Sequence, residues 1–179
     1  MEVRTFETER LLLRPTNADD AELTLRLYNT AEFLQFVGDR NLRTAEDALE
    51  YMKSRTFPQI ENLGYGNYTV ILKSDGTKIG SCGLFHREGL DAADIGFSYL
   101  PQYYGMGYGY EAAKALLDAG FSEFGLGEIS AITVRENIAS QKLIEKLGLT
   151  FRKIVTIPND PEDLLYYLIT KKEWEKLRT

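Results

Sequence analysis

The alternation of apolar and polar residues predicts one segment around which the rest of the chain is organised. Residues 94–100 have the pattern of a half-buried strand, and Pro101 and a glycine-rich run follow them directly. Apolar residues then recur at helical spacing, at Ala112, Ala113, Leu116, Leu117 and Phe121. The glycines within residues 105–109 therefore lie at the N-terminus of a predicted helix.

Two further strands precede this segment. The apolar runs 68–72 and 79–85 flank residues 74–77, whose Asp-Gly pair is typical of a hairpin turn. A second reversal at residues 87–91 leads into the strand at residues 94–100. The pattern therefore predicts a three-stranded antiparallel meander that ends at the glycine-rich turn.

The N-terminal third of the chain predicts a short apolar run and two helices. Residues 10–15 end in a proline, and Thr16 or Asn17 can cap a helix after them. Residues 44–47 resemble a capping box that opens a second helix to about Ser54. The predicted buried positions of these helices are Ala21, Leu25, Tyr28, Ala48, Tyr51 and Met52. The stretch between them is interpreted as an apolar loop that contains Phe33, Leu34, Phe36 and Val37.

The C-terminal third predicts a strand, a helix, a hairpin and a last helix. Residues 129–134 form the strand, and Asn137 can cap the helix that follows it. Residues 149–157 and 164–169 form the closing hairpin, and Thr170 caps a last short helix.

This order of elements predicts a mixed α/β fold in one domain of residues 1–179, with helices on both faces of one sheet. The strand before the glycine-rich turn and the strand after its helix are joined by a crossover, so they should run parallel. If these two strands splay at their C-terminal ends, an extended ligand can lie between them. It would then use unpaired backbone groups of residues 94–100.

Composition and charge narrow the class of protein. A chain of 179 residues that is 44% hydrophobic and 27% charged has the composition of an ordinary globular protein. A net charge of −6 argues against a nucleic-acid partner and is compatible with a cationic substrate. Cys82 is the single cysteine, which excludes an intrachain disulfide and favours a reducing compartment. Without an apolar run long enough for a membrane span or a signal peptide, we expect a soluble, cytoplasmic protein with no membrane partner.

The glycine-rich turn predicts a phosphate or pyrophosphate site, and three motifs compete for it. A Walker loop needs Lys and then Ser or Thr after its last glycine, where this chain has Tyr108-Gly109-Tyr110. A dinucleotide fingerprint needs its third glycine one position later and an acid at the end of the next strand, whereas Glu128 precedes that strand. The pattern Gln102-x-x-Gly105-x-Gly107 matches the third motif, the [Q/R]-x-x-G-x-G/A turn of the GCN5-related N-acetyltransferases (GNAT), at every fixed position.

Separated segments of nearly the whole chain resemble this family, in its RimJ/RimL ribosomal-protein N-acetyltransferase type. They are residues 8–15, 94–101, 104–108, 111–117, 137–140 and 145–149. The resemblance implies the GNAT fold, a mostly antiparallel central sheet with one splayed parallel strand pair. It also implies acetyl-CoA as co-substrate and direct attack of a primary amine in a ternary complex. A protein N-terminal α-amine, such as that of a ribosomal protein, is the favoured acceptor, and a small polyamine or aminoglycoside remains open.

The same resemblance assigns roles to residues of this chain. The backbone of residues 104–109 would hold the CoA pyrophosphate, the strand edge at residues 97–100 would pair with the pantetheine arm, and Asn137 would contact that arm. The full set assigned to the cofactor is Phe97, Ser98, Tyr99, Leu100, Gln102, Tyr104, Gly105, Met106, Gly107, Tyr108, Gly109, Asn137 and Ser140. No metal site is predicted.

Two residues are catalytic candidates. Ile144 stands where many family members carry a tyrosine that protonates the thiolate. The resemblance to the RimJ/RimL type implies that a serine three residues after the asparagine takes this place, which makes Ser140 the candidate proton donor. Asp94 stands where the subfamily carries a glutamate base, and its side chain is shorter. A structural interpretation stands beside each: Ser140 as an ordinary residue of a first helical turn, and Asp94 as a solvated carboxylate at a strand end.

Other polar residues have structural interpretations, and other functions stay open. Asn137 can be only a helix cap, while His86 and Cys82 are interpreted as structural. A non-catalytic acyl-CoA-binding or regulatory module and a nucleotide-dependent oxidoreductase are the alternatives to the enzyme. Acceptor specificity is expected in the first two helices, residues 40–43 and residues 158–161. A monomer and a homodimer are both compatible with the sequence.

Overall fold

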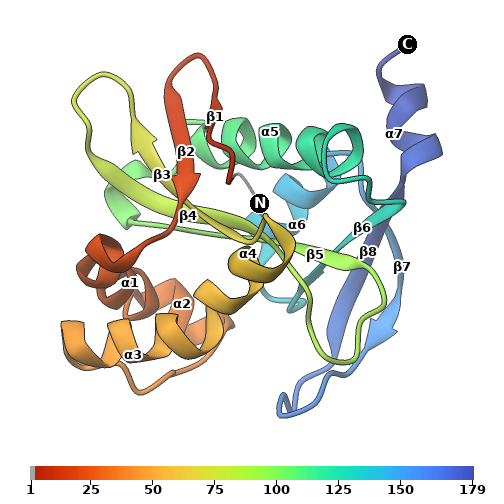
Figure 1. Ribbon diagram of the computed structural model, residues 1–179. Coiled ribbons are helices and arrows are strands. Elements are labelled where there is room, and N and C mark those ends of the chain that lie inside the picture. The colour runs from red at the N-terminus through yellow and green to blue at the C-terminus, as the bar shows by residue number, and fades with distance from the viewer. Residues whose placement is uncertain (1–2) are drawn as a thin grey trace.

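The computed structural model describes residues 3–179, and over this range eight strands form one sheet. The strand order is β1-β2-β3-β4-β5-β6-β8-β7, and every neighbouring pair is antiparallel except β5 and β6 (Figure 1). The strands are β1 (Phe6–Glu7), β2 (Leu11–Pro15), β3 (Asn67–Leu72), β4 (Lys78–Phe85), β5 (Ala93–Tyr99), β6 (Glu128–Thr133), β7 (Thr150–Val155) and β8 (Leu164–Thr170).

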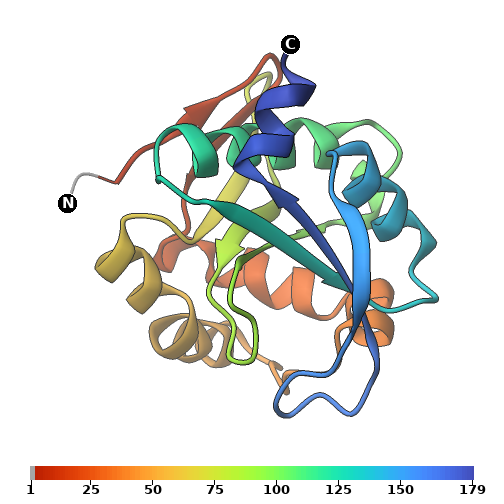
Figure 2. The same cartoon turned by 90° about the vertical axis from the view of Figure 1, so that its right-hand side faces the viewer.

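Helices cover both faces of this sheet. In Figures 1 and 2 the first four helices lie below the sheet and α5 lies above it. The α-helices are α1 (Ala21–Tyr28), α2 (Ala31–Phe36), α3 (Ala45–Arg55), α4 (Phe57–Leu63), α5 (Tyr108–Ser122), α6 (Ile138–Lys146) and α7 (Lys171–Leu177), and short 3-10 turns cover Ala18–Asp20 and Pro101–Tyr103. The predicted mixed α/β fold is confirmed.

The main core lies between the sheet and α5. The positions that recur at helical spacing are the ones that α5 buries: Leu116 is fully buried and Phe121 is 1% exposed. They pack with Leu84 and Ile129 of the sheet and with Ile144 of α6 in one cluster. Burying a side chain of this size contributes about 1.5–3 kcal/mol, so this face of α5 fixes the helix on the sheet.

The parallel pair of strands separates soon after it begins. The register between β5 and β6 contains only Ala93 opposite Ile129 and Asp94 opposite Ser130. On its other side β5 stays paired with β4 as far as Tyr99. The predicted splay is therefore confirmed, and over the described residues the edge of β5 that faces β6 has no strand partner beyond Asp94.

A buried carboxylate anchors the segment before α1. Asp20 is fully buried and accepts two hydrogen bonds from Arg14, at 2.7 and 2.8 Å. It also pairs with Lys78 at 2.8 Å and accepts a hydrogen bond from Thr69. Asn17 caps this segment as predicted, but the first turn is a 3-10 turn. These contacts fix the start of α1 against β2, β3 and β4, the strands that carry Arg14, Thr69 and Lys78.

The structure corrects one prediction and adds three elements. The stretch predicted as an apolar loop is the helix α2, because the Thr30 side chain accepts a hydrogen bond from the N–H of Phe33 and caps it. The helix α4, which carries Pro58 in its first turn, and the strand β1 were not predicted. Neither was the 3-10 turn that leads from β5 to the glycines. Within residues 3–179 no helix has the length and apolar character to cross a bilayer.

Candidate active site

Two cavities lie next to each other along β5 and share part of their walls. One, the Asp94 cavity, has a volume of about 240 Å³, and the other, the glycine-turn cavity, has a volume of about 460 Å³. The residues that line both are Phe33, Phe36, Val37, Phe97, Ser98, Asn137 and Ser140. A ligand that occupies both cavities therefore passes over the C-terminal half of β5, where the sheet is open.

The glycine-turn cavity ends at a helix N-terminus that no side chain caps. Gly105 and Gly107 have positive φ angles of 73° and 82°, and Gly107 is the N-cap of α5. A Cβ at Gly105 would meet nothing within 4 Å, so the turn faces open space. The first backbone N–H groups of α5 have no intrahelical partner and lie at the positive end of the helix dipole. This geometry suits a phosphate or pyrophosphate group.

The Arg10 side chain contacts the glycine-rich turn and the first turn of α5, and it does not line the cavity. Its Nε donates to Glu111 Oε1 over 2.8 Å, and its Nη1 donates to the carbonyl oxygen of Met106 over 2.9 Å. The guanidinium also lies 4.3 Å from the ring centroid of Tyr108. Glu111 further accepts a hydrogen bond of 2.5 Å from Thr8. Since Met106 stands between the two glycines, these contacts fix its carbonyl on the side of Arg10.

The open edge of β5 forms the floor between the two cavities. Side chains alternate along a strand, so Asp94 and Ser98 lie on one face while Ile95 and Tyr99 pack into the core beside α5. Both Asp94 and Ser98 line the Asp94 cavity. Because pairing with β6 has already ended, backbone groups in residues 95–99 can accept a strand-like ligand.

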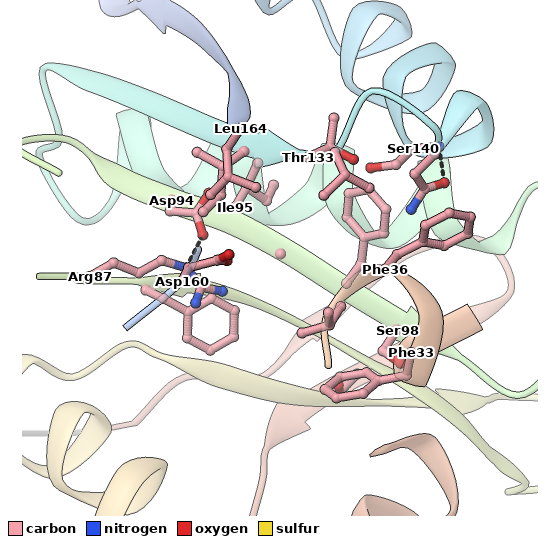
Figure 3. A pocket seen from close by; sticks show the side chains of 18 of the residues that line it. Phe33, Phe36, Arg87, Asp94, Ile95, Ser98, Thr133, Ser140, Asp160 and Leu164 are labelled. Carbon is pink, nitrogen blue, oxygen red and sulfur yellow. Dashed lines mark hydrogen bonds and ion pairs between the residues drawn. The ribbon is translucent and has the colours of Figure 1, made fainter. Parts of the chain in front are cut away.

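The first turn of α6 faces the same floor. Asn137 Oδ1 accepts a hydrogen bond of 3.2 Å from the N–H of Ser140, so the predicted capping role of Asn137 is confirmed. That bond leaves the amide nitrogen of Asn137 available, and the hydroxyl of Ser140 makes no hydrogen bond within the described chain. Figure 3 shows Ser140 beside Thr133 and above Ser98 and Phe33. These two polar groups can therefore face a ligand.

A buried ion pair closes the far end of the Asp94 cavity. Arg87 Nε donates to Asp94 Oδ2 over 2.5 Å, and Asp94 is only 1% exposed (Figure 3). Burial raises the pKa of Asp94, and the charge and hydrogen bond of Arg87 act in the opposite direction. The predicted solvated carboxylate at a strand end is therefore wrong for Asp94, because the β4–β5 loop folds Arg87 over it.

Aromatic rings form the wall opposite β5. The Tyr28 ring stacks on Phe33 with centroids 4.3 Å apart, and it meets Tyr51 edge to face at 5.5 Å. Burial raises the pKa of the Tyr28 phenol, while the nearby guanidinium groups of Arg40 and Arg87 lower it. Helices α1, α2 and α3 thus supply a wall of aromatic rings, and Arg40 and Arg87, from the segments after α2 and β4, place guanidinium groups near it.

The comparison with known families decides the identity. The sequence profile described as "Acetyltransferase (GNAT) domain" matches residues 10–150. The chain belongs to the GNAT acetyltransferase family. It is similar to the uncharacterized N-acetyltransferase YnaD of Bacillus subtilis, with 29% identity over 171 residues that cover 93% of this chain and 97% of the relative. The protein is therefore an acetyltransferase enzyme.

Solved structures agree on the fold. A GNAT-family acetyltransferase from Bacillus anthracis has 28% identity and a TM-score of 0.77, and the match covers 94% of this chain and 99% of that one. A structure described as RimL, ribosomal L7/L12 alpha-N-protein acetyltransferase in complex with coenzyme A, has a TM-score of 0.78 at 16% identity, with coverage of 93% and 98%. At that identity the second likeness shows the fold alone.

The structure of this GNAT enzyme brings together most of the residues predicted for the cofactor. Those that line the glycine-turn cavity are Phe97, Ser98, Tyr99, Tyr104, Gly105, Gly107, Tyr108, Gly109, Asn137 and Ser140. Leu100, Gln102 and Met106 do not line it. Leu100 is buried against α1, and the Met106 side chain is 50% exposed.

The structural interpretations of two other residues are confirmed. His86 Nε2 lies 2.7 Å from the hydroxyl oxygen of Tyr65, and His86 lines neither cavity. Cys82 is fully buried, and burial raises the pKa of its thiol to about 12. Neither residue is therefore placed to react with a ligand in the cavities.

Several residues that line the two cavities were not predicted from the sequence. Lys142 and Lys146 lie one turn apart on α6 and line the glycine-turn cavity, and this i, i+4 spacing was a readable signal. Arg87 was assigned only to a reversal, and Glu32 fell in the supposed loop. The hydroxyl of Tyr104 donates to Glu32 over 3.3 Å and so links the glycine-rich turn to α2. No local pattern predicts such a link.

Proposed function

We propose that this GNAT enzyme transfers the acetyl group of acetyl-CoA to a primary amine by direct attack in a ternary complex. The observation that carries the proposal is the continuity of the two cavities along the open edge of β5. One cavity ends at the uncapped N-terminus of α5, and the other ends at Asp94. A diphosphate and an amine can therefore approach the same strand from opposite ends.

The cofactor would be held by groups of the chain that have no other partner. Backbone N–H groups around Gly105 and Gly107 would bind the pyrophosphate, and Lys142 and Lys146 add positive charge to that wall. The pantetheine arm would pair with the edge of β5, and the free amide nitrogen of Asn137 would donate to it. These groups support acetyl-CoA as the co-substrate.

The acetyl carbon would lie above residues 97–99 of β5. The amine nitrogen attacks it, the C–S bond breaks, and the products are an acetamide and the thiol of CoA. A backbone N–H of this segment would stabilise the oxyanion that forms during the attack. The Ser140 hydroxyl, free of other hydrogen bonds in the described chain, would supply a proton to the departing thiolate.

Asp94 would receive the proton from the amine through water. Asp94 and Ser98 are four residue steps apart on the strand, which corresponds to ~13 Å, so the proton would pass along several waters and not by direct transfer. The raised pKa of Asp94 makes it a stronger base than an exposed carboxylate. An α-amine has a pKa of about 7.7–8.0, so a weak base is sufficient.

The favoured acceptor is the α-amine of a protein or peptide, as in the RimJ/RimL type. The resemblance of residues 8–15, 137–140 and 145–149 to that type supports this choice, together with the shared fold of the RimL structure. Polyamines and aminoglycosides are the competing acceptors.

The direct test is thiol release from acetyl-CoA with a panel of peptides, polyamines and aminoglycosides. We expect turnover that depends on an acceptor and follows ternary-complex kinetics. CoA affinity without turnover on any amine would contradict the proposal and favour a binding module. Labelling of the enzyme by the acetyl group in the absence of an acceptor would contradict direct attack.

A further inference from the structure

The ionisable side chains that line the Asp94 cavity come from helices, loops and the strand β5. They are Tyr28, Arg40, Tyr51, Arg87, Asp94 and Asp160. The formal charges of the two arginines and two aspartates cancel, so net charge does not identify the ligand. The hydrogen-bonding groups that are both free and accessible identify the ligand instead.

Each acidic group is already engaged on one oxygen. Asp94 Oδ2 accepts from Arg87, and Oδ1 is shielded from solvent, with no hydrogen-bond partner in residues 3–179. Asp160 Oδ1 accepts a hydrogen bond of 3.0 Å from the N–H of Glu162 within its own loop. The two acids therefore offer one free oxygen each, and the free oxygen of Asp94 is out of contact with solvent.

The basic groups are largely free. Arg87 uses only Nε, so in the described chain both of its terminal nitrogens lack an acceptor, and its side chain is 39% exposed above the Phe85 ring. Arg40 makes no ion pair with any described residue. The acid beside it, Asp39, is already paired with Arg43 at 2.6 Å. Two guanidinium groups thus offer paired N–H donors to the cavity, the arrangement that binds a carboxylate.

The spacing along β5 sets the length of such a ligand. The ion pair of Arg87 and Asp94 lies ~13 Å along the strand from Ser98, where the acetyl group would lie. Figure 3 shows Arg87 and Asp94 on one side of the cavity and Ser98 and Ser140 on the other. Subtracting about 3 Å of contact distance at each end leaves roughly 7 Å between the amine nitrogen and the anionic group.

We propose that the acceptor of this enzyme is a primary amine that carries a carboxylate roughly 7 Å from its nitrogen, with Arg40 and Arg87 binding the carboxylate. This inference rests on the proposed function. Two sources have this chemistry: a peptide with an acidic side chain in its second residue, and a free ω-amino acid. Tyr28, Tyr51 and Phe85 enclose the chain that joins the two ends.

Matched acceptor pairs test the proposal. The peptide pair is alanyl-glutamate and alanyl-glutamine, both as C-terminal amides, and the small-molecule pair is 6-aminohexanoate and 6-aminohexanamide. We expect kcat/KM to be about tenfold or more higher for the acid in at least one pair, because a bidentate guanidinium contact is lost in the amide. The pair that shows the preference identifies the source.

Variants assign the preference to residues. Arg40→Gln should reduce the preference to about twofold or less, and Arg87→Lys, which keeps a charge beside Asp94, should reduce it partly. Arg55→Gln is the control, because Arg55 is an exposed arginine outside both cavities. Thermal shift by the acid and the amide in the presence of CoA provides a readout that does not need turnover.

The outcomes separate this inference from the proposed function. Equal use of acid and amide, or a preference for spermidine, would overturn the carboxylate assignment and leave acetyl transfer intact. A preference that survives in Arg40→Gln and Arg87→Lys would also overturn it. No turnover and no difference in thermal shift would overturn both.

Discussion

Arg10 and Glu111 are 101 residues apart in the sequence and form an ion pair of 2.8 Å. The pair connects the turn between β1 and β2 to the first turn of α5. The same guanidinium donates to the carbonyl of Met106, so one side chain bridges the glycine-rich turn and the helix behind it. The shape of the proposed pyrophosphate site therefore depends on a residue near the N-terminus, far from the turn in sequence.

The first prediction concerns this bridge. Arg10→Ala should raise KM for acetyl-CoA about tenfold and change kcat less than about twofold, because the turn loses its support while the acetyl site is untouched. Steady-state kinetics measure both constants. Arg4→Ala is the matched control, since Arg4 pairs with Glu123 near the other end of α5. An equal rise of KM in both variants would refute the role of Arg10.

The second prediction concerns Gly105. Its φ of 73° and the φ of 70° at Gly125 are alike, and a Cβ at either residue meets nothing within 4 Å. Valine at either site should cost a similar ~1–2 kcal/mol of folding free energy. Only Gly105→Val should abolish CoA binding, because only Gly105 lines the glycine-turn cavity. Denaturant unfolding and calorimetric titration with CoA measure the two effects, and equal CoA affinity in both variants would contradict the site.

The third prediction separates the two roles of Asn137. Asn137→Ala should lower stability by about 1 kcal/mol through loss of the cap of α6. Asn137→Ser should keep the cap, because a serine hydroxyl also accepts from the N–H of Ser140. If the amide contacts the pantetheine arm, both variants should bind CoA several-fold more weakly. Normal CoA affinity in Asn137→Ser would show that the cap is the whole role.

The fourth prediction concerns acid stability. Burial by itself would raise the pKa of Asp20, but hydrogen bonds from Arg14, Lys78, Asn17 and Thr69 outweigh it and hold the pKa well below its ordinary value. Ionised Asp20 therefore contributes its full stabilisation of the folded protein above about pH 3.9, the pKa of an aspartate in the unfolded chain. This contribution is lost as the pH falls below that value.

Asp20→Asn tests this directly. It should lower the free energy of unfolding by about 3 kcal/mol at pH 7 and flatten the dependence of stability on pH below about 4. Asp19→Asn is the control, because the Asp19 side chain is exposed and makes no ion pair with a described residue. Urea unfolding between pH 3 and pH 7, at about unit intervals, measures the effect. If the free energy of unfolding depends on pH in the same way in wild type and in Asp20→Asn, this role of Asp20 is excluded.

The fifth prediction concerns Asp94 as a base. A base acts when unprotonated, so kcat/KM should rise with pH through the raised pKa of Asp94, above the ordinary value of about 3.9. Asp94→Asn should remove this acid limb and lower kcat about 100-fold. Asp160→Asn, in the same cavity, should keep the limb. If kcat/KM of Asp94→Asn still rises with pH over the same range, the rise belongs to another group, such as the acceptor amine.

Local patterns predicted most of the elements. Helix α5 was predicted from its apolar spacing, α3 and α7 from their capping boxes, and the hairpin of β3 and β4 from Asp75-Gly76, since each depends on neighbours in the sequence. Helix α2 was missed because its six residues are too few for a periodic signal, and Thr30 alone marks its start.

The sequence by itself determined most of the strands and helices, apart from β1, α2 and α4, together with the glycine-rich turn at the start of α5 and the cap at Asn137. These features depend on backbone preferences within a few residues. Only the tertiary structure decided that Arg87 neutralises Asp94, that Arg10 supports the turn, and that Arg40 and the rings of α1 to α3 enclose one cavity with β5. The physical reason is that ion pairs and cavity walls join side chains far apart in the sequence, and their positions are set by how the layers pack.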